Sequence, residues 1–281
     1  LSVSDIVIMR RCILNSETIS PITETIQKMD SYIANKIAAS GITGVDESNL
    51  ENGIVNVGDR TRIANVIRKA QRGEEITICC LGGSVTEGAV STKVPSGVNC
   101  TLPNKPSNYC DLLCGWFADM FGCKVNKVNA GISATDSVLG VHRITEDVLP
   151  YNPDLVVVEY AVNETGFEYK GATYEALVRE LLNSGTAVML LEVCCPPSNG
   201  LASAQIYEEP VAYRYQVPMV SYRDAYKNVP DFEKFAADVV HPNIIGHTYL
   251  TLNMVYYIEQ VYSDIANIAG SGYGATSGCY Y

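Results

Sequence analysis

The sequence lacks several features that would point to common classes of function. Only 20 basic residues stand against 31 acidic ones, which gives a formal net charge of −11. Such a balance argues against nucleic acids and anionic membrane surfaces as partners. No apolar run reaches the length that a membrane span requires. We therefore expect a protein that neither binds nucleic acid nor associates with a membrane.

Patterns of metal ligands are also missing. The ten cysteines include no pair of Cys-x-x-Cys motifs, so a zinc site is not expected. Cys79 and Cys80 lie in an apolar run, and we expect buried free thiols with room for one disulfide. Histidine is scarce, with only His142, His241 and His247. A reaction that requires an imidazole base therefore has few candidates.

The chain begins at Leu1 with neither an initiator methionine nor a signal peptide, so we expect a piece of a longer protein. Residues 1–14 allow two interpretations. They could form a short amphipathic helix capped by Ser2 or Ser4. They also resemble the second half of a dockerin repeat, the calcium-loop module that attaches enzymes to cellulosomes. On that resemblance Asp5 is the last ligand of a severed loop, which would hold calcium poorly.

Strand and helix patterns alternate through most of the chain. A helical stripe at 22–40 and a Gly/Asn/Asp-rich connector at 41–58 precede a predicted helix at 59–71. Helices are also predicted at 107–121, 136–149, 173–183 and 202–215, and from Pro242 to about Ile265, with a loop at 89–106. The apolar runs between them predict five strands, which begin at Ile76, Lys124, Leu155, Ala187 and Val217.

This alternation predicts an α/β protein of three layers, with helices on both faces of a central, mostly parallel five-stranded sheet. In such sheets, functional groups gather at the carboxyl ends of the strands. We divide the chain into the segment with the dockerin resemblance (1–16), an N-terminal helical segment and connector (17–58), a main domain (59–266) and a Gly/Ser/Tyr-rich, linker-like tail (267–281).

The strand that begins at Ile76 ends in Gly82-Gly83-Ser84. Glycine permits a tight turn because it has no Cβ, so we expect the Ser84 hydroxyl at the edge of the sheet. A serine hydroxyl becomes a useful nucleophile only with a base in reach and donors for the developing oxyanion. Three other segments lie after strands or before the last helix. They are 129–134 (Asn-Ala-Gly-Ile-Ser-Ala), 159–164 (Glu-Tyr-Ala-Val-Asn-Glu) and 238–247 (Asp-Val-Val-His-Pro-Asn-Ile-Ile-Gly-His).

Together and in this order, the four segments resemble the SGNH hydrolases, a branch of the GDSL esterases, over about residues 59–265. The resemblance implies a flavodoxin-like fold with a nucleophile at Ser84, a base at His241 and a carboxylate at Asp238 that orients the base. It also implies an oxyanion hole made by the backbone N–H groups of Ser84 and Gly131 and the side-chain amide of Asn163. It implies neither a cofactor nor a metal.

Two of the segments depart from the usual family pattern. The nucleophile block is Gly-Gly-Ser-Val rather than Gly-Asp-Ser-Leu, and Glu164 stands where an aspartate is usual. The block is similar to that of carbohydrate esterases that remove O-acetyl groups from plant polysaccharides. We therefore expect a secreted acetylesterase that acts on xylan, mannan or a related glycan through an acyl-enzyme on Ser84. The dockerin resemblance implies a cohesin on a cellulosomal scaffoldin as a further partner.

Two other functions stay open from the sequence alone. A lipase or thioesterase of the same superfamily would need a long apolar groove, and no extended apolar loop lies near the four segments. A non-catalytic glycan-binding module would have no need of Ser84, Asp238 and His241 together. Four aromatic residues near the segments could stack on sugars or pack in the core, namely Tyr109, Trp116, Tyr160 and Tyr169.

Overall fold

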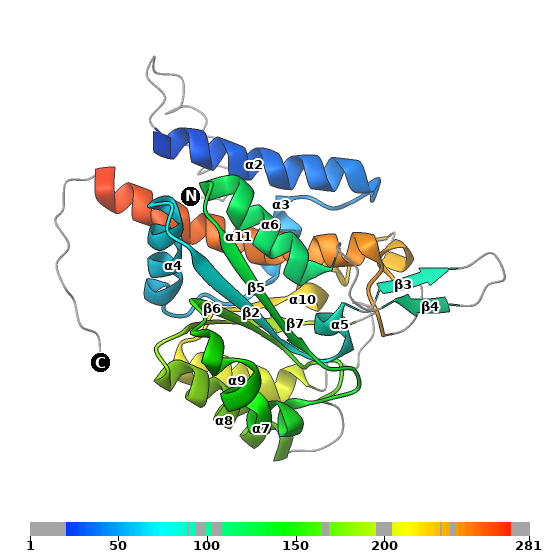
Figure 1. Cartoon of the computed structure of the whole chain (residues 1–281). Helices are drawn as coiled ribbons and strands as arrows, with labels where there is room; N and C mark the ends of the chain where they lie inside the picture. The colour runs from blue at the N-terminus through cyan, green and yellow to red at the C-terminus, as the bar shows by residue number, and fades with distance from the viewer. Residues whose placement is uncertain are drawn as a thin grey trace.

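The computed structural model describes residues 21–88, 90–93, 99–102, 108–164, 169–194, 204–230, 232–236 and 240–270. The segment with the dockerin resemblance, including Asp5, lies outside the described residues, as do most of the predicted tail and Asp238. Helices cover both faces of a central sheet (Figure 1). The α/β/α fold class that the sequence predicts is therefore confirmed.

The sheet has six strands in the order β1-β8-β7-β6-β2-β5. Five of them run parallel: β2 (Ile76–Gly82), β5 (Val125–Gly131), β6 (Leu155–Glu159), β7 (Ala187–Glu192) and β8 (Met219–Ser221). In the register, Gly82 pairs with both Gly131 and Glu159. The carboxyl ends of three neighbouring strands therefore meet at one edge of the sheet.

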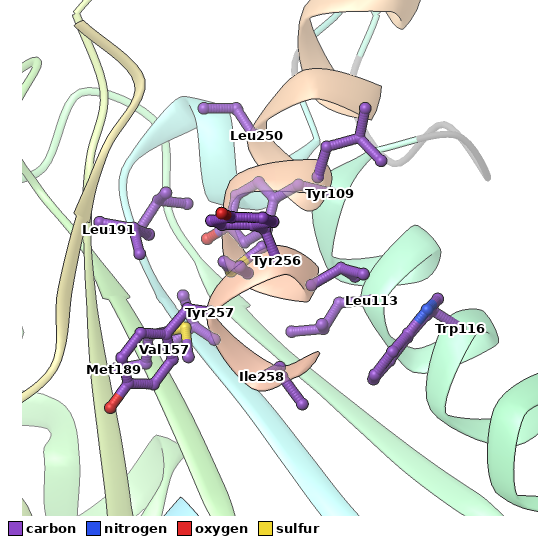
Figure 2. Packing of buried hydrophobic residues seen from close by; sticks show 14 of the residues in the cluster. Tyr109, Leu113, Trp116, Val157, Met189, Leu191, Leu250, Tyr256, Tyr257 and Ile258 are labelled. Atoms are coloured by element: carbon purple, nitrogen blue, oxygen red, sulfur yellow. The ribbon is translucent and has the colours of Figure 1, made fainter. Parts of the chain in front are cut away.

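One face of the sheet is covered by α4 (Thr61–Gln71), α6 (Tyr109–Phe121) and α11 (Ile244–Gly270), with α2 (Pro21–Ser40) packed outside α11 and α6. Figure 2 shows this core. Tyr109, Leu113 and Trp116 of α6 lie beside the Leu250–Ile258 part of α11, and the side chains of β6 and β7 lie on the other side of α11. Residues 249–259 of α11 are all buried, which agrees with the largely apolar sequence of this helix.

The opposite face is covered by α7 (Ser137–Asp147), α8 (Tyr169–Asn183) and α9 (Gln205–Tyr215). Their apolar sides form a second buried cluster with the sheet, in which Ile144, Leu177 and Val211 each come from a different helix. β6 and β7 are buried on both faces, which explains their nearly continuous apolar runs.

The predicted connector at 41–58 is wrong in part, because it contains two regular elements. Asp46 caps α3 (Glu47–Asn52) with a reciprocal capping box that includes Asn49. β1 (Ile54–Asn56) then pairs antiparallel with β8 and adds a sixth strand to the five predicted. β1 thus lies before the predicted boundary at residue 59 but in the same sheet as the strands after it, and the division into domains stays a prediction.

The prediction of a loop over residues 89–106 is also wrong in part. It contains β3 (Val90–Lys93) and β4 (Asn99–Leu102), which pair antiparallel in a small separate sheet that projects from the body of the protein (Figure 1). Short elements complete the described fold: α5 (Ser84–Glu87), α10 (Tyr222–Tyr226), η1 (Leu149–Tyr151) and η2 (Phe232–Phe235).

The described part of the chain has no helix with the length and apolar character of a membrane span. Six cysteines whose side chains the structure describes are free thiols: Cys79, Cys80, Cys110, Cys114, Cys123 and Cys194. Five of these six are buried, as the sequence predicts.

Candidate active site

Ser84 lies where β2 ends and α5 begins. A Cβ built on Gly82 would stand 2.1 Å from Thr86 Oγ1 and 2.2 Å from the carbonyl oxygen of Glu159. Glycine at this position lets the chain turn directly from the buried strand into α5, which begins at Ser84. The serine is 8% exposed, at the carboxyl edge of the sheet. The backbone therefore presents its hydroxyl at the site that the sequence predicts.

His241 faces Ser84 from the segment that leads into α11. The Ser84 Oγ and His241 Nε2 atoms are 3.0 Å apart, which is hydrogen-bond distance. The segment is held by a β-bridge between Ala236 and Pro242. Asn243 then caps α11, because its Oδ1 accepts the N–H of Gly246 at 2.9 Å. The fold thus brings a hydroxyl and an imidazole into direct contact.

The other two histidines have different surroundings. His142 is exposed on α7. His247 is buried in α11, where its Nδ1 accepts the backbone N–H of Tyr109 at 3.2 Å. Asp238, the carboxylate predicted to orient His241, lies outside the described residues, so that role stays a prediction.

Asn163 follows β6 and lies over the turn that precedes Ser84. Its Nδ2 donates to the carbonyl oxygen of Thr135 at 2.9 Å. The same nitrogen would be 2.6 Å from a Cβ built on Gly83. Because an amide nitrogen carries two N–H groups, it can hold Thr135 and also donate to a negative oxygen near Ser84. The structure thus places Asn163 next to the predicted nucleophile.

Gly131 ends β5 in close contact with α5. A Cβ there would be 2.1 Å from the backbone nitrogen of Glu87, so only glycine fits. Its own N–H donates to Asn129 Oδ1 at 2.9 Å, and Asn129 Nδ2 donates to the carbonyl oxygen of Thr86 at 2.8 Å. An oxyanion would have to share or displace the Asn129 contact. Asn129, which the sequence indicates only as a neighbour of Gly131, thus links β5 to α5.

The loop after β5 carries backbone strain next to these groups. Ala134 has a φ of 60°, in the left-handed region that residues other than glycine rarely adopt. It immediately precedes Thr135, the residue that holds Asn163. Strain of this kind persists only where surrounding contacts enforce it, and it is common at functional sites.

Three of the aromatic residues considered as sugar platforms belong to the core. Tyr109, Trp116 and Tyr160 are all at most 1% exposed. They therefore pack in the interior instead of stacking on a ligand. The side chain of Tyr169 lies outside the described residues.

Replacement of Asn163 by alanine is expected to lower kcat for an ester substrate on the order of 10²–10³-fold, because one oxyanion donor is lost. KM should change little, since the donor acts mainly on the transition state. Steady-state kinetics with p-nitrophenyl acetate would measure both constants. Asn65→Ala, an exposed change on α4, is the matched control. If Asn163→Ala had the wild-type kcat, the assignment of Asn163 as an oxyanion donor would be wrong.

Buried carboxyl groups behind the site are a feature that the sequence analysis missed. Glu159 and Glu192 end β6 and β7, and Glu208 on α9 is buried as well and interacts electrostatically with both. Burial raises the pKa of Glu159 and of Glu192 to about 7, and it raises the pKa of Glu208 as well. In the sequence, Glu159 and Glu192 each follow an unbroken run of apolar strand residues. A glutamate in that place looks like the exposed end of a strand, so the sequence does not indicate its burial.

Because these carboxyl groups have raised pKa values, we expect the free energy of unfolding to fall as pH rises. A carboxyl whose folded pKa is about 7 keeps a proton that the unfolded chain, with an ordinary pKa of 4.5, releases. Between these two values each such group therefore lowers the free energy of unfolding by up to about 1.4 kcal/mol per pH unit. Glu192→Gln should reduce this slope, as measured by urea unfolding from pH 5 to pH 8.

The control for that experiment is Glu146→Gln, which removes an exposed carboxylate on α7. This variant should keep the wild-type pH slope, because surface substitutions have small effects. A slope for Glu192→Gln equal to that of the wild type would mean that Glu192 does not hold its proton in the folded protein.

The chain is similar to several known proteins. Residues 80–249 match the family model described as the GDSL-like lipase/acylhydrolase family. Among solved structures, a two-domain esterase active on acetylated mannans, co-crystallised with mannopentaose, is 30% identical with a TM-score of 0.68. A second structure of a two-domain esterase active on acetylated mannans is 31% identical, with a TM-score of 0.67.

These two matches cover 76% of this chain, which spans only 57% and 56% of the lengths of the two esterase chains. An acetyl xylan esterase is 20% identical with a TM-score of 0.51, over 64% of this chain and 98% of that one, and shares the fold. No curated protein matches. The family match covers more than half of the sequence and includes both Ser84 and His241, and the chain belongs to the GDSL-like lipase/acylhydrolase family.

Proposed function

We propose that the chain is a carboxylic ester hydrolase that removes O-acetyl groups from a plant cell-wall polysaccharide such as mannan or xylan. The observation that carries the proposal is the 3.0 Å contact between Ser84 Oγ and His241 Nε2 beside the Asn163 amide. A hydroxyl, an imidazole and an amide donor at one sheet edge are the groups that acyl transfer requires.

In the proposed reaction, His241 Nε2 accepts the Ser84 proton as Oγ attacks the acetyl carbonyl carbon. The carbonyl oxygen becomes an anion, which the side-chain amide of Asn163 and backbone N–H groups stabilise. His241 then gives the proton to the sugar oxygen as the ester bond breaks, leaving an acetyl group on Ser84. His241 then takes a proton from water as the water oxygen attacks the acyl carbon, and it returns that proton to Ser84 Oγ as the acyl–oxygen bond breaks and acetate leaves. Asp238 is proposed to orient the imidazole during both steps.

The proposed substrate is based on the similarity of the chain to two solved esterase structures. The two similar structures with 30% and 31% identity are named as esterases active on acetylated mannans. The acidic composition of the chain also suits a neutral polymer better than a polyanion. Because plant cell-wall polysaccharides are degraded outside cells, we propose an extracellular site of action. Attachment to a cohesin through a dockerin stays a prediction from residues 1–14.

The test is acetate release from acetylated glucomannan and acetylated xylan, together with p-nitrophenyl esters of increasing acyl length. The proposal expects turnover of both the acetylated polymer and the acetyl ester, with activity falling as the acyl chain lengthens. Preference for long acyl chains would instead indicate a lipase or thioesterase. Binding of the polymer without any turnover would indicate a glycan-binding module. Ser84→Ala is the control for contaminating esterases.

A further inference from the structure

Arg143 is a buried cation that the proposed reaction does not use. It lies on α7, and its side chain is only 8% exposed. A guanidinium so deeply placed is costly unless its N–H groups are satisfied. Its Nη1 contacts Asp147 at 2.9 Å, but that carboxylate, one turn further along the same helix, is 40% exposed. The inner nitrogen, Nη2, has different partners.

Those partners are the carboxyl ends of three adjacent strands. Nη2 donates to the carbonyl oxygen of Ala130 in β5, to that of Gly82 in β2 at 3.3 Å, and to the hydroxyl of Tyr160, just after β6, at 3.2 Å. One nitrogen therefore joins the three strand ends from which Ser84, Gly131 and Asn163 are presented.

A small residue makes this approach possible. A Cβ built on Gly140 would stand 2.6 Å from the Tyr160 hydroxyl. Glycine here lets α7 lie close enough to the sheet for Arg143 to reach the strand ends. The buried arginine and the helical glycine are three residues apart, so they share one face of α7.

The contacts fix the orientation of two particular peptide units. The carbonyl group of Ala130 belongs to the same rigid peptide plane as the N–H of Gly131, and that of Gly82 to the same plane as the N–H of Gly83. Because Arg143 donates hydrogen bonds to both carbonyl oxygens, it also fixes the directions of the Gly131 and Gly83 N–H groups. A hydrogen bond to a carbonyl group also polarises its peptide and strengthens the N–H as a donor.

We propose that Arg143 is a positioning residue for oxyanion stabilisation: it holds the ends of β5, β2 and β6 in the alignment that the Ser84 backbone, Gly131 and Asn163 need. It touches no substrate. The proposal rests on the esterase function above. Because misplacement of catalytic groups by about 1 Å can cost on the order of 10²-fold, loss of this contact should be visible in turnover.

The test compares Arg143→Gln and Arg143→Lys with the wild type, using p-nitrophenyl acetate and phenylboronic acid. The boronic acid forms a tetrahedral anion on a reactive serine and so reports oxyanion binding. We expect Arg143→Gln to lower kcat by roughly 10–100-fold with KM changed less than about threefold. The dissociation constant of the boronic acid should rise by a similar factor, which a change in stability alone would not produce.

Asp147→Asn is the matched control. It removes the ion pair of Arg143 but leaves the carbonyl contacts in place, so kcat and boronic acid binding should stay near wild type. If Arg143→Gln does not fold, Arg143→Lys provides the test. Its single ammonium group cannot reproduce the geometry of a planar guanidinium, so we expect an intermediate loss.

Two results would overturn the proposal. One is a folded Arg143→Gln or Arg143→Lys protein with wild-type kcat and boronic acid affinity. The other is an Asp147→Asn protein as impaired as Arg143→Gln, which would assign the effect to the ion pair. A wild-type protein that hydrolyses no ester would instead refute the proposed function, and the role of Arg143 with it.

Discussion

Ser84→Ala should lower kcat for acetyl ester hydrolysis on the order of 10⁶-fold, the scale seen when a triad serine is removed from a hydrolase. The variant loses the hydroxyl oxygen that lies 3.0 Å from His241 Nε2. No acyl-enzyme can then form. A residual rate above that of water is expected, because the oxyanion donors and the binding site remain.

This loss should occur without loss of the fold. Ser84 is a small residue at the carboxyl edge of the sheet, and its replacement leaves the apolar contacts of β2 unchanged. We expect circular dichroism and the unfolding midpoint to stay close to wild type. Ser133→Ala is the matched control, since Ser133 is exposed on the neighbouring loop and its hydroxyl donates to the Glu87 carboxylate. Its kcat should stay within a few fold of wild type.

A chemical readout separates this prediction from a contaminating activity. A fluorophosphonate reagent should label the wild-type protein at Ser84 and should not label Ser84→Ala. Turnover of Ser84→Ala at even a hundredth of the wild-type kcat would show that another group attacks the ester.

The sheet and its helices could be predicted because their signals are long. The strands at Ile76, Leu155 and Ala187 are buried on both faces, so each leaves an unbroken apolar run. β1 has only three residues, which is too short for any periodicity, and its place depends on pairing with β8. Pairing between distant segments leaves no local mark in the sequence.

The same reasoning applies to the site. Ser84 and Asn163 follow strand ends, and His241 precedes the last helix, so a parallel sheet explains why they could gather at one edge. The role of Arg143 could not be predicted in this way. In the sequence it is one charged residue in an amphipathic helix, next to the exposed His142. Its burial depends on the approach of α7 to the sheet at Gly140.

Replacement of His241 by alanine is expected to be about as damaging as Ser84→Ala, with kcat again lower on the order of 10⁶-fold. Without the imidazole, the Ser84 hydroxyl keeps its proton and the sugar oxygen has no proton donor when it leaves. His142→Ala is the matched control, because that histidine is exposed on α7. Its kcat should stay near the wild-type value.

The double variant Ser84→Ala/His241→Ala gives the sharper measurement. Because the two residues act as one unit, its kcat should equal that of either single variant instead of the product of two losses. Imidazole added to the solution should restore part of the activity of His241→Ala, since His241 is only partly buried, but none of that of Ser84→Ala. Additive losses, or rescue of both single variants, would mean that the contact between Ser84 and His241 is not the one that transfers the proton.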